Sequence, residues 1–199
     1  MIRYELLSEC YREGAVECIA RSFFENDVLG VALGIGFGDW RSFSCGVVEK
    51  SIEDKVSLVA LDGNDVVGAN LCYDFDRYSP DDYNVIESFM PISEFMNCLY
   101  DGYDVPGRVL HFSYIGVISD YSRKGLALNM ARENINIANE MDYDKIILEA
   151  SSPYSQKNGF KLGFKKVKEI FYKDFRYKNQ KVFERVSDVN SCLLMELRL

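Results

Sequence analysis

The sequence predicts a mixed α/β fold: a twisted, mostly antiparallel sheet of about six to seven strands, flanked by helices. Three observations predict it. A hairpin turn joins two apolar runs, a long β-branched and aromatic run lies near the middle of the chain, and helical periodicity follows that run directly. The 199 residues suit a single core, so we expect residues 1–199 to form one domain.

The N-terminal quarter predicts a strand, a helix and a glycine-rich segment. Residues 2–7 alternate weakly, as in a strand, and Ser8 is a candidate N-cap for a helix whose apolar residues recur as far as Phe23. Residues 28–43 contain four glycines and three aromatic residues. This composition favours a loop or a broken helix over one long helix.

The middle of the chain predicts a β-hairpin and a helical segment. The runs 57–61 and 66–73 flank Asp-Gly-Asn-Asp, whose residues tolerate a positive φ. Apolar residues between 86 and 99 indicate helical turns, which Pro91 should interrupt.

The C-terminal half predicts a central strand and a helix. Residues 109–118 are apolar on both faces and rich in β-branched and aromatic side chains, which is typical of a central strand. Residues 127–141 have helical spacing. The remaining elements are a strand at 145–150, a short helix at 155–162, and strands at 167–175 and 191–197.

Composition excludes several classes of function. The net charge of −8 disfavours a nucleic-acid partner, since such binding depends on clustered Lys and Arg. No run approaches the roughly 18 apolar residues of a membrane span. The six cysteines form no C-x-x-C pair, and the first residues lack the apolar stretch of a signal peptide. We expect a cytoplasmic protein without a metal site or membrane anchor, either a monomer or a homodimer.

A six-residue loop joins the central strand to the helix after it. It consists of Ser122, Arg123, Lys124, Gly125, Leu126 and Ala127. Arg123 and Lys124 supply charge for a phosphate, Gly125 lets the backbone approach it, and Ala127 permits close packing. The loop has neither a G-x-G-x-x-G nor a Walker pattern. It therefore reads as an anion-binding turn, with a plain helix start as the alternative.

Residues 117–127 resemble the [QR]-x-x-G-x-[GA] loop of the GCN5-related N-acetyltransferases (GNAT), with Ser122 in place of Gln or Arg. The segment from Ser155 through Leu-Gly-Phe at 162–164 resembles a second feature of that family. The resemblance implies acetyl-CoA as co-substrate, bound by the loop and along the strand at Ile115 and Val117. Backbone N–H groups near Val117 would then stabilise the oxyanion.

A narrower likeness is to the arylalkylamine and dopamine N-acetyltransferases. Segments 23–29, 151–155 and 172–175 carry it. The first resembles F-F-x-D-E-P-L, whose glutamate is proposed as general base; Asp27 occupies that position here, while Asn26 and Val28 replace Asp and Pro. The likeness implies a small aryl- or alkylamine acceptor.

Acetyl transfer needs a base that makes the amine neutral. Asp27 and His111, the only histidine, are the candidates, and a surface carboxylate and a structural histidine are the corresponding alternatives. In the family's histone-acetylating branch a glutamate occupies the position that matches His111. Strand alternation predicts that the His111 side chain faces the same way as those of Ser113, Ile115 and Val117.

The departing thiolate needs a proton, and the acceptor needs a binding surface. Tyr154 and Ser155 offer hydroxyls for the first task, although Tyr154 also suits ordinary packing, and the family's commonest acid position aligns with Gly159. We expect the acceptor to contact a set of aromatic residues, for which core packing is the alternative. They are Phe24, Phe37 and Trp40.

Three functions therefore remain open. The first is acetyl-CoA-dependent N-acetylation of a small-molecule primary amine. The second is N-acetylation of a protein or peptide. The third is a non-catalytic acyl-CoA-binding module, suggested by the departures at Val28, Ser122 and Gly159.

Overall fold

A computed structural model describes residues 1–77, 86–103, 106–186 and 191–199. Its centre is a seven-stranded sheet with the order β1-β2-β3-β4-β5-β7-β6, in which β4 and β5 are parallel and all other neighbours antiparallel. The strands are β1 Ile2–Leu6, β2 Leu58–Asp62, β3 Asp65–Asp74, β4 Val109–Val117, β5 Lys145–Ala150, β6 Lys165–Phe171 and β7 Ser191–Arg198. The predicted mixed, mostly antiparallel sheet is confirmed, with β4 at its middle.

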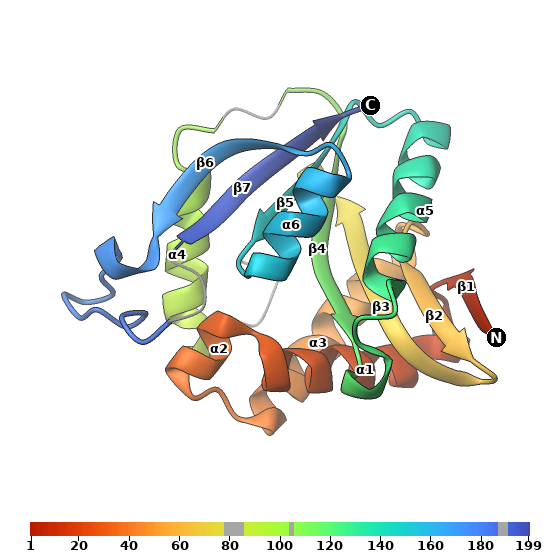
Figure 1. Cartoon of the computed structure of the whole chain (residues 1–199), viewed down its shortest axis with the longest axis horizontal. Helices are drawn as coiled ribbons and strands as arrows, with labels where there is room; N and C mark the ends of the chain where they lie inside the picture. The colour runs from red at the N-terminus through yellow and green to blue at the C-terminus, as the bar shows by residue number, and fades with distance from the viewer. Residues whose placement is uncertain (78–85, 104–105, 187–190) are drawn as a thin grey trace.

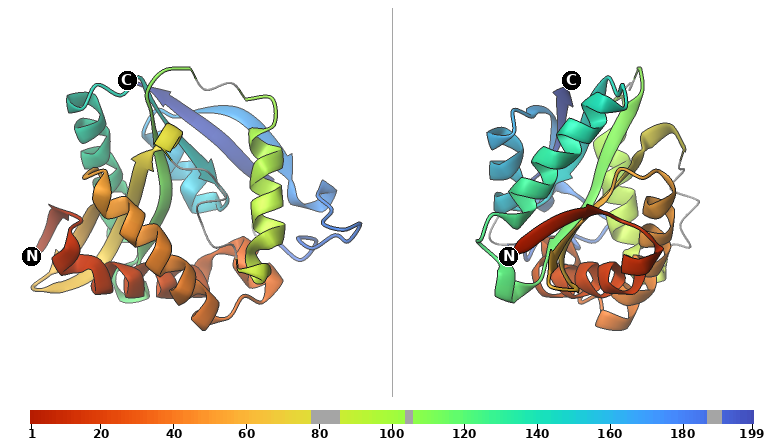
Figure 2. Two further views of the ribbon diagram at one scale, coloured as in Figure 1. Left: turned by 180° about the vertical axis from the view of Figure 1, so that it is seen from behind. Right: turned by 90° about the vertical axis from the view of Figure 1, so that its right-hand side faces the viewer.

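Helices cover both faces of the sheet. They are α1 Arg12–Asn26, α2 Val28–Leu33, α3 Phe37–Glu53, α4 Met90–Tyr100, α5 Leu126–Glu140 and α6 Pro153–Lys161. In Figure 1, α5 and α6 lie in front of the sheet; seen from behind in Figure 2, α3 and α4 lie in front. The core accordingly divides: one apolar cluster joins α5 to β4 and β5, and another joins α1 and α3 to β2 and β3.

The glycine-rich segment contains both a break and a long helix. Gly34 ends α2 in the left-handed conformation with φ 69°, so the predicted break is confirmed. The 17-residue α3 that begins at Phe37 was not predicted. Its buried residues include Trp40, Val47 and Val48, and this apolar stripe outweighs the low helix propensity of its glycines.

Pro91 does not interrupt a helix, contrary to the prediction. It lies in the first turn of α4, where the missing N–H has no helical partner to lose. A 3₁₀ turn, Glu87–Phe89, precedes it. Another 3₁₀ turn, Tyr172–Asp174, replaces the last residues of the strand predicted at 167–175.

A β-bulge at Ser113 divides β4 into two halves. Against β3, Phe112 pairs with Cys72 and Tyr114 with Leu71, so Ser113 is an extra residue without a register partner. An extra residue reverses the alternation of side chains along the strand.

The bulge overturns the prediction that His111 faces the same way as Ile115 and Val117. His111 packs against Tyr73 and, like Tyr100 of α4, lies on the face that α3 and α4 cover. Val117 belongs to the apolar cluster of α5, on the opposite face. Ile115 pairs in register with Asn70, whose side chain also reaches α5.

Candidate active site

β4 and β5 diverge halfway along their length. Their parallel pairing covers four residue pairs, from Val109 opposite Lys145 to Phe112 opposite Leu148. Within the described ranges, the rest of β4 has no strand partner on the β5 side. The divergence begins at the bulged Ser113, so the C-terminal half of β4 is hydrogen-bonded to β3 alone.

The backbone N–H of Val117 points towards this open side. The next N–H, that of Ile118, donates to the carbonyl oxygen of Val67 (3.1 Å), so Val117 must point away from β3. Val117 N–H instead donates to Ser22 Oγ of α1 (3.2 Å). The helix comes this close because Gly116 has no side chain; a Cβ there would lie 3.0 Å from Cβ of Ser22.

The loop after β4 has the geometry of an anion-binding turn. Arg123 has φ 61° and Gly125 has φ 81°, and a Cβ on Gly125 would meet nothing within 4 Å. Gly125 is also the N-cap of α5 and provides no side chain to accept from the first-turn N–H groups. In such a turn successive N–H groups converge, and the helix dipole adds positive potential.

The loop is attached to β2 at one end and is mostly exposed. The Lys124 ammonium lies 4.6 Å from the ring centroid of Tyr121, whose hydroxyl donates to Asp62 (2.6 Å). This contact anchors the loop to the end of β2. Ser122, Arg123, Lys124 and Gly125 are exposed, Leu126 is buried and Ala127 is half-buried.

His111 belongs to a buried polar cluster on the other side of the sheet. Its Nε2 lies 2.8 Å and 3.0 Å from the two carboxylate oxygens of Glu149 on β5. The Tyr100 hydroxyl donates to Oε1 of Glu149. The rings of Tyr73 and Phe75 meet the imidazole edge to face, at centroid distances of 5.0 and 5.8 Å. The cluster is formed by residues of β4, β5, α4, the end of β3 and the 3₁₀ turn Phe75–Arg77 that follows β3.

Glu149 is ionised despite its burial. Desolvation opposes its charge, but the electrostatic interaction with His111 and the hydrogen bonds from His111 and Tyr100 outweigh it, and the pKa of Glu149 is lowered. Conversely, burial and the nearby Glu149 carboxylate raise the pKa of Tyr100.

Asp27 lies between α1 and α2 and is the N-cap of α2. Its carboxylate accepts from the N–H of Gly30 at 2.6 Å. Burial raises the pKa of Asp27 to about 6, against the lowering effect of the Gly30 and Leu29 N–H groups. A group with this pKa accepts and releases a proton near neutral pH, as a general base must.

Gly30 lets the Trp40 ring approach the half-buried Asp27. A Cβ on Gly30 would lie 2.5 Å from the Trp40 ring and 3.1 Å from the Asp27 carboxylate. The glycine thus allows the indole to pack against the first turn of α2, next to the carboxylate. Trp40 itself is 3% exposed and packs against Phe23 and Phe89.

A buried thiol lies near both carboxylates. Burial, and then the charges of Glu149 and Asp27, raise the pKa of Cys192 far above its usual range. Burial, and then the charges of Cys192 and Asp27, raise the pKa of Tyr172, whose hydroxyl donates to the carbonyl of Ser151 (2.7 Å). The two carboxylates therefore act on one small region at the start of β7. A thiol so strongly protonated is a poor nucleophile.

The other predicted site residues lie in different surroundings. Tyr154 is 69% exposed at the start of α6. Ser155 forms a capping box with Ser152: its N–H donates to Ser152 Oγ, and its hydroxyl donates to the Ser152 carbonyl (2.9 Å). Phe24 is exposed and meets Phe37 edge to face at 5.8 Å.

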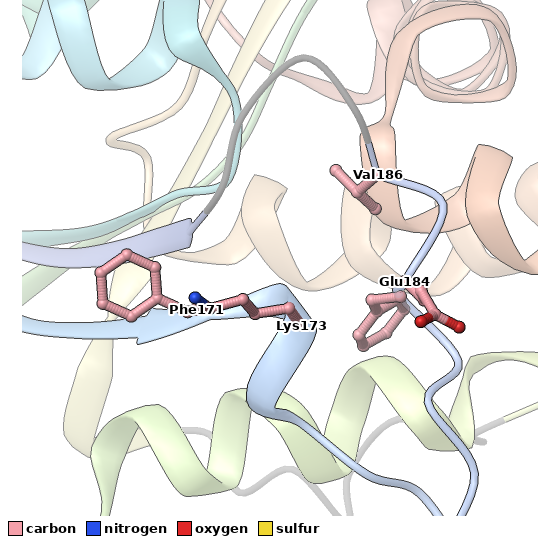
Figure 3. A pocket seen from close by; sticks show the side chains of 5 residues that line it. Phe171, Lys173, Glu184 and Val186 are labelled. Carbon is pink, nitrogen blue, oxygen red and sulfur yellow. The ribbon is translucent and has the colours of Figure 1, made fainter.

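Two cavities lie outside this region. One of about 280 Å³ is bordered by residues from the end of β6 and from the segment near 184, as Figure 3 shows; its lining is Phe171, Lys173, Phe183, Glu184 and Val186. Another of about 360 Å³ lies at Gly163, Lys165, Glu196, Leu197 and Arg198. Neither lining includes the loop, Asp27 or His111, so the chemistry of the side chains locates the site better than cavity size does.

Three residues of this region were not predicted from the sequence: Ser22, Tyr100 and Glu149. Glu149 had a signal, because it is an acidic residue inside the otherwise apolar strand 146–150. Ser22 and Tyr100 had no such signal in the sequence, since each forms its hydrogen bond with a residue far away in the chain.

In the described ranges, no three His, Cys, Asp or Glu side chains are arranged to hold a metal ion. None of the described helices combines the length and apolar character needed to cross a membrane.

Comparison with protein-family models and with curated protein sequences gave no match. Solved structures do match. The C-terminal condensation domain of Ebony, in complex with beta-alanyl-dopamine, has a TM-score of 0.88 at 18% identity, over 100% of this chain and 99% of that domain. Arylalkylamine N-acetyltransferase 2 from Aedes aegypti has a TM-score of 0.78 at 21% identity, over 99% and 98%.

A third similar structure is the polyamine N-acetyltransferase of Drosophila melanogaster, which catalyses the formation of N-acetylagmatine. It has a TM-score of 0.81 at 14% identity and covers 100% of both chains. These likenesses confirm the fold predicted from the sequence, that of the GCN5-related N-acetyltransferases.

Proposed function

We propose that this chain transfers the acetyl group of acetyl-CoA directly to a primary amine of a small molecule, aryl- or alkylamine-like. The observation that supports the proposal most directly is the divergence of β4 from β5, which divides β4 into a paired half and an open half. Its open half leads directly into the anion-binding turn, and its other half holds His111 beside the buried Glu149. The names of the similar structures, two of which are small-amine N-acetyltransferases, support the same class of acceptor.

The residues of the open half of β4 and of the loop suit coenzyme A. The exposed side chains of Arg123 and Lys124 and the uncapped start of α5 would hold the diphosphate. The outward N–H of Val117 and the exposed edge at Ile115 would lie along the pantetheine arm. Acetyl-CoA supplies a thioester, whose carbonyl carbon is the electrophile.

The chain must remove and return protons. Asp27, or alternatively His111, takes one proton from the ammonium form of the acceptor; the neutral amine forms the new C–N bond as the C–S bond breaks. The second amine proton leaves the nitrogen as the sulfur gains one. Of the two proposed donors to sulfur, Tyr154 is better suited, because the Ser155 hydroxyl already donates within its cap.

The same residues support the finer parts of the proposal. The exposed Phe24 and the half-buried Phe37 form an aromatic pair just before Asp27 and after α2, where they would contact an aryl or alkyl group. We also propose that residues 1–199 act as one domain, as a monomer or homodimer in the cytoplasm.

The test is thiol release from acetyl-CoA in the presence of panels of small amines and of peptides. We expect release with aryl- or alkylamines and formation of the N-acetylated product. Release with peptides alone would favour the protein N-acetyltransferase. Calorimetric binding of CoA without release from any acceptor would leave only the non-catalytic module, and absence of CoA binding would contradict all three functions.

A further inference from the structure

We propose that Glu149 is a positioning residue, which holds His111 as the tautomer protonated on Nε2 and so directs the Nδ1 lone pair to the acceptor amine. This role rests on the proposed function. It assigns a task to a pair of residues, Glu149 and Tyr100, that sequence motifs do not identify.

The geometry of the Glu149 contact fixes which ring nitrogen carries the proton. Both carboxylate oxygens lie within 3.0 Å of Nε2 of His111. An ionised carboxylate can only accept hydrogen bonds, so Nε2 must be the donor. In the neutral ring the second nitrogen is then the acceptor.

The second nitrogen, Nδ1, is buried and has no hydrogen-bond partner among the described residues. Buried polar atoms are nearly always paired in folded proteins. The flanking groups, the rings of Tyr73 and Phe75, meet the imidazole edge to face and so leave its nitrogens to other partners. An amine N–H would satisfy the orphaned lone pair.

Tyr100 holds Glu149 in turn, and the chain contains a matched pair of residues close by. Three residues further along the chain, after the end of α4, Tyr103 donates to Glu196 of β7 at 2.7 Å, as Tyr100 donates to Glu149. Glu196 also lies 3.6 Å from the Lys145 ammonium. The Tyr103–Glu196 pair thus attaches the same part of the chain to the sheet without touching His111.

The first experiment is ¹⁵N NMR of the ring nitrogens, which is unambiguous because the chain has one histidine. At a pH where the ring is neutral, we expect Nε2 to carry the proton, with the downfield proton resonance of a bond to a carboxylate. Glu149→Gln should lose this resonance, and Glu196→Gln should keep it. An Nδ1-protonated ring, or a resonance unaffected by Glu149→Gln, would overturn the proposal.

The second experiment is steady-state kinetics of the same variants. We expect Glu149→Gln to lower kcat roughly 100-fold with little change in KM for acetyl-CoA, and Tyr100→Phe to lower it less. Tyr103→Phe should leave kcat within about twofold, since His111 keeps its partner. Equal losses in Tyr100→Phe and Tyr103→Phe would show a structural role and overturn the proposal.

The two proposals can fail separately. If the wild-type protein transfers no acetyl group to any amine, the proposed function fails, while NMR still decides the tautomer. If transfer occurs and Glu149→Gln retains full kcat, the positioning role alone fails.

Discussion

The two halves of the site are built in different ways. The loop after β4 is a contiguous, exposed segment whose geometry comes from backbone conformation, with two residues at positive φ. The region around His111 and Glu149 is buried and is formed by side chains of separate elements, and the half-buried Asp27 lies at the start of α2. A site formed by the backbone tolerates changes of side chain but not of φ. A site formed by a cluster of side chains is instead sensitive to changes of those side chains. Each half should therefore respond to its own kind of substitution.

The largest effect should come from the side-chain half. Asp27→Asn keeps the N-cap of α2, because Asn caps as well as Asp, but it removes the carboxylate that can accept a proton. If Asp27 is the base, kcat/KM falls by roughly 10² to 10⁴. In the wild type, kcat/KM should decline as pH falls through about 6, where the carboxylate becomes protonated.

The control for that variant is Asp39→Asn, which alters a carboxylate in the first turn of α3. It should leave kcat/KM nearly unchanged. A wild-type pH profile retained in Asp27→Asn would exclude Asp27 and leave His111 as the base.

A backbone change should have a smaller effect, limited to the cofactor. Gly125→Ala introduces a Cβ at φ 81°, where an L-residue is strained although no atom lies in its way. We expect the Kd of CoA, measured by calorimetry, to rise about tenfold as the turn relaxes.

Gly63 offers the matched substitution. It has φ 62° and equally open surroundings in the β2–β3 hairpin. Gly63→Ala should cost similar stability, about 1 kcal/mol, without altering CoA binding. Similar Kd values in the two variants would contradict the assignment of the loop.

A smaller effect is expected at Ser22, where the two halves meet. Its hydroxyl accepts from the Val117 N–H that the pantetheine arm would need. Ser22→Ala should therefore strengthen CoA binding a few-fold, while the lost bond costs about 1 kcal/mol of stability. Weaker CoA binding would show that Ser22 supports the cofactor and does not compete with it.

The last effect concerns the free energy of unfolding. Its pH dependence measures how far folding shields the Asp27 carboxylate from water. The pKa of Asp27 is raised to about 6 by folding, so its contribution is fully present below the unfolded pKa near 3.8 and is lost as pH rises through 6. Relative to Asp27→Asn, the wild type should lose about 2 kcal/mol of unfolding free energy between pH 4 and 7, measured by urea titration. A constant difference would contradict the burial.

Local features were predictable, and features that depend on distant partners were not. The hairpin and the central strand each follow from a few neighbouring residues. The predicted direction of the His111 side chain was wrong, because Ser113 forms a bulge. The bulge results from the register between β3 and β4, which the sequence of β4 alone does not contain. Glu149 and Tyr100 meet His111 only after three elements have packed, so no spacing in the chain encodes the cluster.

The bulge at Ser113 reverses the alternation of side chains between the two faces of the sheet halfway along β4. Before the bulge, His111 points towards the face that α3 and α4 cover; after it, Ile115 and Val117 point towards α5, although all three positions have the same parity in the sequence. Removing this single residue would exchange the faces of one half relative to the other. The spacing between His111 and Val117 is therefore constrained, and natural variation in this strand should substitute residues more often than it inserts or deletes one.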